Sequence, residues 1–233
     1  MKSIIKTKLI WDIDGTLLRT NGAAAIAFSK AVSDFAGVNV EINRKHLSGF
    51  TDYEIAMYLL DSHNISFEMK NITQILIEYV QNLPKSLEII GVDLINSIDL
   101  VLEKLFQYPD IDLLIGTGNC LAGAKVKLEH VNLKRFFLDK NFYVSSEVDW
   151  NRDMVIQKAK NSLSGNEIGI VIGDSPRDIK SAKKSGLNVI AVPTGAHSRN
   201  ELESNCPTFT LNEDWHYSDL MIALEKIKEL ETH

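Results

Sequence analysis

The 233-residue sequence contains few cysteines, few prolines and no long hydrophobic run. Its two cysteines, Cys120 and Cys206, are too few to form a disulfide framework in a chain of this size, so we expect a reducing compartment. No apolar run reaches the roughly 18 residues of a membrane-spanning helix, and the first residues lack the apolar stretch of a signal peptide. We therefore expect a cytoplasmic protein that does not enter a membrane.

Basic residues are also in the minority. The 25 lysines and arginines stand against 31 acidic residues and give a formal net charge of −6. This charge argues against nucleic acid as the main partner. An anionic small molecule is still a possible substrate, because one bound cation can reverse the sign of a site locally. The 45% hydrophobic fraction, without a low-complexity tract, predicts a folded chain with a substantial core.

Short apolar runs predict the buried strands of a sheet, and helical patterns lie between them. The runs cover residues 9–11, 111–115, 168–172 and 187–192, with 208–211 as a short fifth. The helical patterns cover residues 121–131, 153–163, 176–185 and 217–230. Alternation of buried strands with helices is typical of an open parallel sheet. We predict an α/β fold with a Rossmann-like parallel-sheet core.

The stretch between the first two strands has a different character. It contains helical patterns at residues 23–35, 52–62, 67–83 and 93–106, and no convincing strand. This predicts a helical domain inserted after the first strand. The resulting division gives a core of residues 1–19 and 109–233, and an inserted domain of residues 20–108.

Acidic, small or hydroxylic residues follow three of the predicted strands, at the point where each strand ends. They are Asp12 and Asp14, Thr117 and Asn119, and Asp174 and Asp178. Ligands of an open parallel sheet bind beyond the carboxyl ends of its strands, so we expect these side chains to meet at one edge. Several carboxylates in one place repel one another unless a hard cation neutralises them. Oxygen ligands without histidine or cysteine favour Mg²⁺.

Three segments resemble the motifs of the haloacid dehalogenase (HAD) superfamily of phosphatases and phosphotransferases. Residues 12–17 (DIDGTL) resemble its DxDGT signature, residues 117–119 (TGN) its second motif, and residues 173–178 (GDSPRD) its acidic fourth motif. They occur in the family's order, each after a predicted strand. The resemblance implies a HAD-like core with an α-helical cap domain, and Mg²⁺-dependent hydrolysis of a small phosphorylated metabolite.

The resemblance also implies catalytic roles, which agree with the chemistry of phosphoryl transfer. Asp12 would attack phosphorus and form an aspartyl-phosphate. Asp14 would protonate the leaving oxygen and later activate water. Mg²⁺ would be held by Asp12, Asp174 and the backbone carbonyl of Asp14, with Asp178 acting from behind these ligands.

The other motif residues would bind the substrate. The Thr117 hydroxyl would hold phosphate oxygens as a catalytic group, together with nearby backbone N–H groups. Gly15 lets the chain leave the strand sharply and leaves room for phosphate. The substrate-binding residues implied by the motifs are Gly15, Thr16, Gly118 and Asn119.

The family's third motif is a lysine or arginine before the strand of the fourth motif. The lysine–proline pair that many members have is absent. Residues 149–153 (DWNRD) resemble the variant in which arginine opens a helix, and we select Arg152 as the catalytic cation. The alternatives are Lys158 and Lys160, for which a solvated helix face is the simpler interpretation.

Residues 49–52 (GFTD) resemble a segment in the helical caps of phosphoglycolate-phosphatase-like members, where Asp52 is expected to cap the following helix. Closure of a cap would exclude water and select the substrate. Phosphoglycolate is the family-level expectation, although related caps admit sugar phosphates, nucleotides and other phosphoesters. A phosphomutase and a non-catalytic phosphate-binding protein are the alternatives. The Gly-x-Ser-x-Gly pattern of a serine hydrolase is absent.

Overall fold

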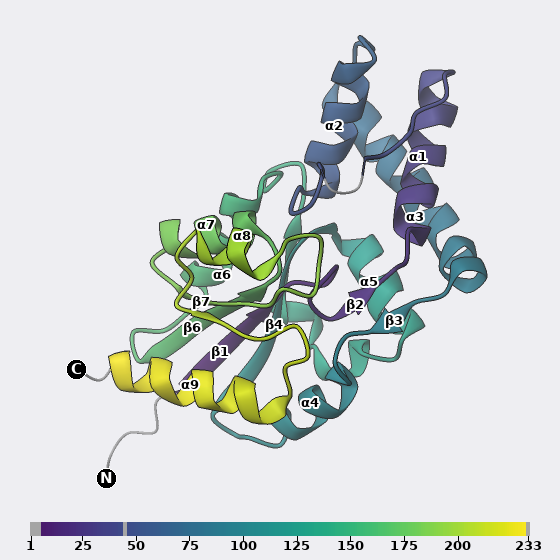
Figure 1. The fold of residues 1–233 in the computed structure, drawn as a ribbon. Coiled ribbons are helices and arrows are strands. Elements are labelled where there is room, and N and C mark those ends of the chain that lie inside the picture. Colours follow the sequence, from purple (N-terminus) through teal and green to yellow (C-terminus); the bar gives the residue numbers. More distant parts are fainter. Residues whose placement is uncertain (1–5, 44–45, 232–233) are drawn as a thin grey trace.

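The structure is a computed structural model that describes residues 6–43 and 46–231. Its centre is a six-stranded sheet in the order β5-β4-β1-β6-β7-β8, and every neighbouring pair of strands is parallel (Figure 1). The strands are β1 (Lys6–Trp11), β4 (Ile111–Cys120), β5 (Phe142–Ser145), β6 (Glu167–Gly173), β7 (Asn188–Ala191) and β8 (Phe209–Thr210). The predicted α/β fold with a parallel-sheet core is confirmed.

The register of the central strands explains why the motifs meet. Trp11 at the end of β1 lies opposite Ile115 of β4 on one side and Ile172 of β6 on the other. The Asp12 N–H continues the ladder by donating to the Ile172 carbonyl at 3.0 Å. The residues that follow these three strands are therefore neighbours at the carboxyl edge of the sheet.

Alternate residues of the strands face two separate hydrophobic clusters. Leu9 and Trp11 of β1 belong to one cluster, and Ile10 belongs to the other. The first cluster includes residues of α4 (Ile98–Leu105), α5 (Leu121–His130) and α9 (Tyr217–Glu231). The second includes residues of α6 (Arg152–Asn161), α7 (Pro176–Lys184) and α8 (Arg199–Glu203). Helices thus cover both faces of the sheet, as buried parallel strands require.

The inserted helices form a hydrophobic cluster of their own. They are α1 (Ala23–Ala36), α2 (Asp52–Ser62) and the long α3 (Met69–Ile90), and they stand above the carboxyl edge of the sheet (Figure 1). Phe28 of α1 lies against Tyr79 of α3, with ring centroids 4.7 Å apart. Cys120, at the end of β4, also belongs to this cluster, which links the inserted helices to the sheet.

The region before the second core strand differs from the prediction. Residues 93–106 were predicted as one helix, but Asp93–Leu94 form strand β3, which pairs antiparallel with β2 (Leu18–Arg19). Asn96 and Ser97 then have positive φ angles of 48° and 54°, a conformation that an α-helix does not tolerate, so α4 begins only at Ile98.

Helix α4 packs against the sheet and not against the inserted helices. Its buried residues Ile98, Val101, Leu102 and Leu105 belong to the same cluster as β1 and β4. The predicted inserted domain of residues 20–108 included this helix. We propose instead that the helical domain ends near Gly91, where α3 ends, and that α4 is part of the core.

One strand of the sheet has no counterpart in the sequence analysis. Strand β5 is a four-residue edge strand whose first three residues are only partly buried. Its apolar run, residues 142–144, is only three residues long and was not recognised as a strand in the sequence. Two short 3₁₀ helices, Lys134–Phe136 and Asp139–Asn141, connect it to α5. Within the ranges given above, no helix combines the length and apolar character needed to cross a membrane.

Candidate active site

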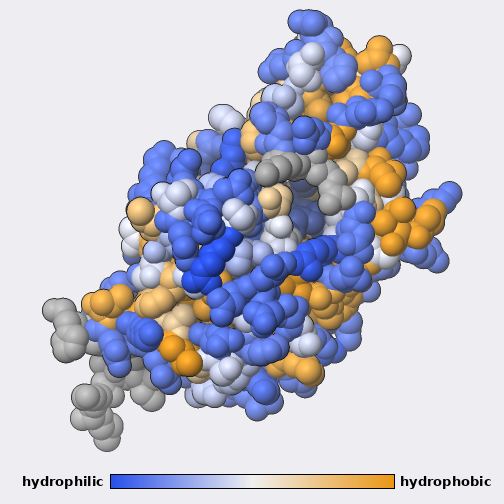
Figure 2. All heavy atoms as spheres, in the orientation of Figure 1, coloured by the Kyte–Doolittle hydropathy of each residue, from blue (hydrophilic) through white to orange (hydrophobic). Residues whose placement is uncertain are grey.

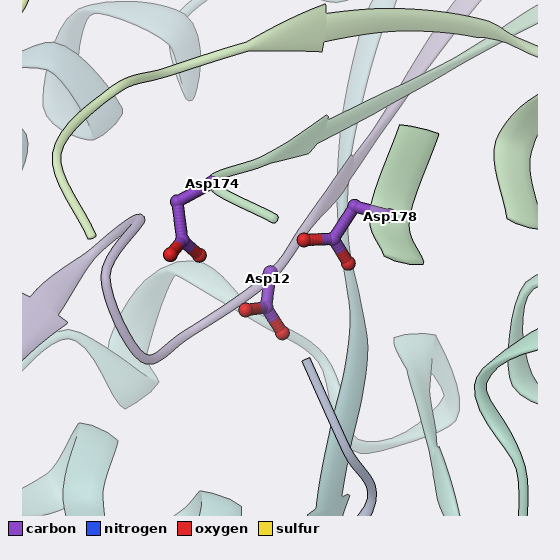
Figure 3. A group of neighbouring side chains, drawn as sticks. All are labelled: Asp12, Asp174 and Asp178. Atoms are coloured by element: carbon purple, nitrogen blue, oxygen red, sulfur yellow. The ribbon is translucent and has the colours of Figure 1, made fainter. Parts of the chain in front are cut away.

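Three carboxylates converge at the carboxyl edge of the sheet. Asp12 follows β1, Asp174 follows β6, and Asp178 lies in the first turn of α7 (Figure 3). One oxygen of each lies within 4.8 Å of the others. We call these three residues the acid cluster. Its carboxylates come from the first motif and the distant fourth motif, and the sequence analysis predicted that they would meet.

The loop after β1 passes very close to Asp174. Gly15 has a φ of +84°, and a Cβ placed on it would lie 2.5 Å from Asp174 Oδ2. A Cβ on Gly195 would lie 1.7 Å from the same oxygen. The Thr16 hydroxyl donates to Asp174 Oδ1 at 3.2 Å, and the Thr194 hydroxyl donates to the Gly15 carbonyl at 2.6 Å. Asp174 is therefore held in a cradle that only glycines leave open.

Arg152, the first residue of α6, is the cation of the cluster. Its side chain is 3% exposed, and its Nη2 lies 3.1 Å from Asp12 Oδ1. It also binds Asp178 Oδ1 through Nη2, and through Nε at 2.8 Å. The structure thus brings the arginine selected from the sequence to Asp12, whereas Lys158 is 59% exposed and pairs with Asp149. Arg152 Nη1 is buried and has no hydrogen-bond partner within the described part of the chain.

Asp178 supports Arg152 from behind. Its Oδ2 accepts hydrogen bonds from the Ser175 backbone N–H at 3.1 Å and from the Ser175 hydroxyl at 2.7 Å, so it closes a capping box at the start of α7. Its Oδ1 accepts from Arg152. Because its two oxygens bind Arg152 and Ser175, Asp178 is placed to orient the arginine.

The acids carry more negative charge than the arginine balances. Burial raises the pKa of Asp12 to about 7, against the lowering effect of the Arg152 charge and of the Thr117 hydrogen bond. Burial, followed by the charges of Asp178 and Asp12, raises the pKa of Asp174 well above its usual range. These are hard oxygen donors crowded around a surplus of negative charge, which fits a divalent cation such as Mg²⁺.

A second polar group surrounds the other carboxylate of the first motif. Asp14 Oδ2 accepts hydrogen bonds from Asn119 Nδ2 at 2.8 Å and from Lys127 Nζ at 2.6 Å. Lys127 Nζ also donates to Asn119 Oδ1 at 2.5 Å. The Thr117 hydroxyl accepts from Asn119 Nδ2 at 2.9 Å, so the second motif is tied to Asp14. The structure therefore brings the first two motifs together as predicted.

Lys127 was not identified from the sequence. It lies on the buried face of α5 with Gly123, Ala124 and Leu128, and its side chain is 3% exposed. Burial lowers the pKa of its ammonium group, but the charges of Asp14 and Asp52 outweigh burial and raise that pKa overall. A lysine at a core position of a helical pattern, eight residues after the end of the second motif, is the signal that would have revealed it.

Residues 49–52, which we call the cap segment, dock against the core. The expectation that Asp52 caps α2 was wrong, because Thr51 is the N-cap and forms a capping box with Glu54. Asp52 is the first helical residue, and its Oδ2 accepts a hydrogen bond from the Cys120 backbone N–H at 2.8 Å. Burial raises the pKa of Asp52 to about 6, although Lys127 and the Cys120 hydrogen bond oppose this.

Gly118 allows the cap segment to approach the second motif. A Cβ on Gly118 would lie 2.7 Å from the Phe50 carbonyl oxygen and 3.0 Å from Thr51 Cα. The Thr51 hydroxyl reaches the Trp150 carbonyl, next to the arginine-bearing helix. Gly118 was expected to bind substrate. The structure shows that it also lets the backbone of the cap segment approach the second motif.

A cavity of about 730 Å³ lies between the inserted helices and the sheet edge. The charged residues Asp12, Asp14, Lys127, Arg152 and Asp174 line its core side. Its other side is largely apolar and comes from the inserted helices and the segments beside them, including Phe28, Ile42, Leu47, Phe50, Ile55 and Tyr79. Figure 2 shows the surface hollowed where the two parts meet. The arrangement pairs a charged floor with a separate compartment for the rest of a ligand.

The parallel sheet, the acid cluster at its edge and the helical domain above it define the class of capped Rossmann-like proteins. Residues 9–192 match the family model of haloacid dehalogenase-like hydrolases, and the chain belongs to this family. The family resemblance that rests on the three motifs is therefore confirmed.

Several solved structures share this fold. A predicted phosphatase from Clostridium acetobutylicum is 23% identical with a TM-score of 0.70, over 97% of this chain and 99% of that chain. A predicted phosphoglycolate phosphatase from Haemophilus somnus 129pt is 15% identical with a TM-score of 0.66, over 95% and 98%. A putative beta-phosphoglucomutase from Bacteroides vulgatus is 17% identical with a TM-score of 0.68, over 98% and 91%. A comparison with curated proteins gives no significant match.

Proposed function

We propose that the protein is a Mg²⁺-dependent phosphatase that hydrolyses a small phosphomonoester through an aspartyl-phosphate on Asp12. One observation carries this proposal: the Asp12 carboxylate lies on the cavity floor against Arg152 and within the acid cluster, two residues before the hydrogen-bonded Asp14. A nucleophile, a cation and a proton-transfer group thus face one cavity, as phosphoryl transfer requires.

In the first step, an oxygen of Asp12 bonds to phosphorus as the bond to the leaving oxygen breaks. Arg152 contacts Asp12 and borders the cavity, and its buried Nη1, which has no hydrogen-bond partner among the described residues, would donate to a phosphate oxygen. Asp14 gives its proton to the leaving oxygen, which departs as an alcohol. The Thr117 hydroxyl, buried beside Asp12, is placed to hold another phosphate oxygen.

In the second step, water attacks the phosphorus of the aspartyl-phosphate. Asp14, now a carboxylate, takes a proton from that water, and the bond between phosphorus and the Asp12 oxygen breaks. The products are inorganic phosphate and the original Asp12 carboxylate. Asp14 is thereby returned to the protonated form that begins the next cycle.

Two members of the acid cluster provide metal ligands in this proposal. Asp12, Asp174 and the backbone carbonyl of Asp14 would hold Mg²⁺, which when bound would neutralise charge on the phosphoryl group. Asp178 would orient Arg152 from behind these ligands, because its two oxygens bind Arg152 and Ser175.

The cavity and the relatives support a small substrate. A volume of about 730 Å³ suits a metabolite, and Gly49, Phe50 and Asp52 of the cap segment line the cavity. A related fold belongs to a predicted phosphoglycolate phosphatase, which makes phosphoglycolate the first compound to test. The two unpaired cysteines are consistent with the cytoplasmic location that the proposal includes.

The test compares wild type with Asp12→Asn on p-nitrophenyl phosphate, with Mg²⁺ and with excess chelator. We expect phosphate release by wild type with Mg²⁺ only, and no release above background by the variant. Asp139→Asn, at a 68% exposed side chain remote from the acid cluster, serves as the matched control and should retain full activity. Unchanged turnover by Asp12→Asn would exclude the nucleophile, and return of labelled phosphate to a sugar would indicate a phosphomutase.

A further inference from the structure

Lys127 is a buried cation that none of the family motifs contains and that the reaction steps above do not use. Its ammonium group lies 2.6 Å from Asp14 Oδ2 and 2.5 Å from Asn119 Oδ1, and it borders the cavity. Its side chain is 3% exposed. The cation therefore sits between the first motif and the second, on the side of Asp14 away from solvent.

The fold does not need a charge at this position. Lys127 shares the buried face of α5 with Ala124 and Leu128, where an apolar side chain would pack without a desolvation cost. Removing an ammonium group from water is unfavourable unless well-placed partners compensate for the lost hydration. The unfavourable burial of this ammonium group points to a role for its charge in the site. The carboxylate that the ammonium group contacts is that of Asp14.

We propose that Lys127 is a positioning residue that fixes the proton-transfer carboxyl of Asp14 toward the leaving group, an inference that rests on the phosphatase function proposed above. Both hydrogen bonds to this carboxyl reach Oδ2. Oδ1 has no hydrogen-bond partner among the residues that the structure describes, and Asp14 lines the cavity. Oδ1 is thus the oxygen that faces the leaving group, and Lys127 holds it there.

The helical domain completes this arrangement. Asp52, from the cap segment, is buried and binds the Cys120 N–H at the start of the helix that carries Lys127. Its negative charge is the second one that acts on Lys127, beside that of Asp14. When the cap segment is docked, the lysine therefore has two counter-charges, those of Asp14 and Asp52, and its hydrogen bond is to Asp14.

Leaving-group chemistry separates this role from a structural one. A nitrophenolate leaves without help, whereas an alkoxide leaves slowly unless it is protonated as the bond breaks. Misplacing Asp14 should therefore affect alkyl phosphates far more than p-nitrophenyl phosphate. A general loss of folded protein would lower the rates of all esters by the same factor.

The experiment measures kcat/KM of wild type and Lys127→Met on p-nitrophenyl phosphate, phenyl phosphate and glycerol 2-phosphate. We expect a loss of less than about tenfold on the first ester and of about 100-fold on the last, within the range of general acid catalysis. Lys125→Met is the matched control: it lies on the same helix, pairs with Asp139 at the surface, and should leave the ratio among the esters unchanged.

A double variant tests whether Lys127 acts through Asp14. On the Asp14→Asn background, Lys127→Met should add no further loss on phenyl phosphate, because the group it positions is gone. Additive losses would overturn the proposal. If Lys127→Met shows no cooperative thermal unfolding, Lys127→Gln takes its place in every assay, and a uniform loss across the esters would again overturn the proposal.

The outcomes distinguish this inference from the function on which it rests. If wild type releases phosphate from no ester, the phosphatase proposal fails, and this inference fails with it. If wild type is active and Lys127→Met keeps the wild-type ratio among the three esters, the function stands and only the role of Lys127 is refuted.

Discussion

The guanidinium of Arg152 joins the two ends of the acid cluster: Nη2 lies 3.1 Å from Asp12 Oδ1 and also binds Asp178 Oδ1. The arginine begins α6, while Asp12 follows β1 and Asp178 lies in the first turn of α7. A single cation thus holds three elements of the core in register. Its loss should affect both stability and chemistry.

Arg152→Met should therefore lower kcat/KM by about 100-fold or more, because a donor to the transferring phosphoryl group is removed. It should also lower the free energy of unfolding by about 3 kcal/mol, since two buried carboxylates lose their cation. Steady-state kinetics and urea denaturation measure these effects. Lys158→Met, on the exposed face of the same helix, is the control, and an equal effect of both variants would contradict the prediction.

Gly195→Ala should weaken Mg²⁺ binding by about tenfold or more, the cost typical of displacing a supporting group at a metal site. The new Cβ would lie 1.7 Å from Asp174 Oδ2 and push that carboxylate out of the acid cluster. Isothermal titration calorimetry with Mg²⁺ measures the change. Gly165→Ala, where a Cβ meets nothing within 4 Å, should bind the ion as wild type does. Equal affinities in the two variants would show that Asp174 is not a ligand.

Asp52 should make the stability of the protein depend on pH. Its pKa is about 6 in the folded state, above the ordinary value of about 3.9, so the folded state binds more protons between these values. The contribution of Asp52 to stability is therefore full below about pH 4 and is lost as the pH rises through about 6. Asp52→Asn cannot titrate but keeps an oxygen for the Cys120 N–H.

The free energy of unfolding of wild type relative to Asp52→Asn should accordingly fall between about pH 4 and 6, by at most about 3 kcal/mol. Urea denaturation of both proteins at several pH values, without metal, measures the difference. A difference that stays constant or rises over this range would be the contrary result.

Arg177 should hold the cap segment against the core. Its Nη1 lies 2.8 Å from Glu54 Oε1, and its guanidinium carbon lies 3.8 Å from the centre of the Phe50 ring. Removing this combined contact, worth about 1 kcal/mol, should raise KM about fivefold and change kcat less. Arg177→Ala tests this by steady-state kinetics. Lys184→Ala changes another residue of α7 and breaks only its surface pair with Asp153 of α6, so it should leave KM unchanged.

The parts of the fold that the sequence predicts are those with a strong local pattern. Strands β1 and β6 contain the apolar runs 9–11 and 168–172, and acids follow both strands, so the strands and the meeting of their ends could be inferred. The selection of Arg152 rests on the resemblance of residues 149–153 to the family's third motif. The structure places it at the start of α6, where Asn151 is the helix cap and accepts from the Met154 N–H.

The remaining features depend on tertiary contacts that leave no local pattern. Two-residue strands such as β2 and β3 are too short to show a period. Asp52 resembles a cap residue by its position, and only the nearby Cys120 N–H gives its carboxylate another partner. In the sequence, Lys127 resembles an ordinary helical lysine. Only the structure shows that its ammonium group binds Asp14.

The membership of Cys120 in the hydrophobic cluster of α1, α2 and α3 gives the molecule a natural reporter. Its thiol is sheltered by the helical domain and, because burial raises its pKa, it stays protonated. Swinging that domain away from the sheet would bring the sulfur into water, while Cys206 at the surface would react at all times. The rate at which Cys120 is alkylated would thus measure how often the helical domain moves away from the sheet.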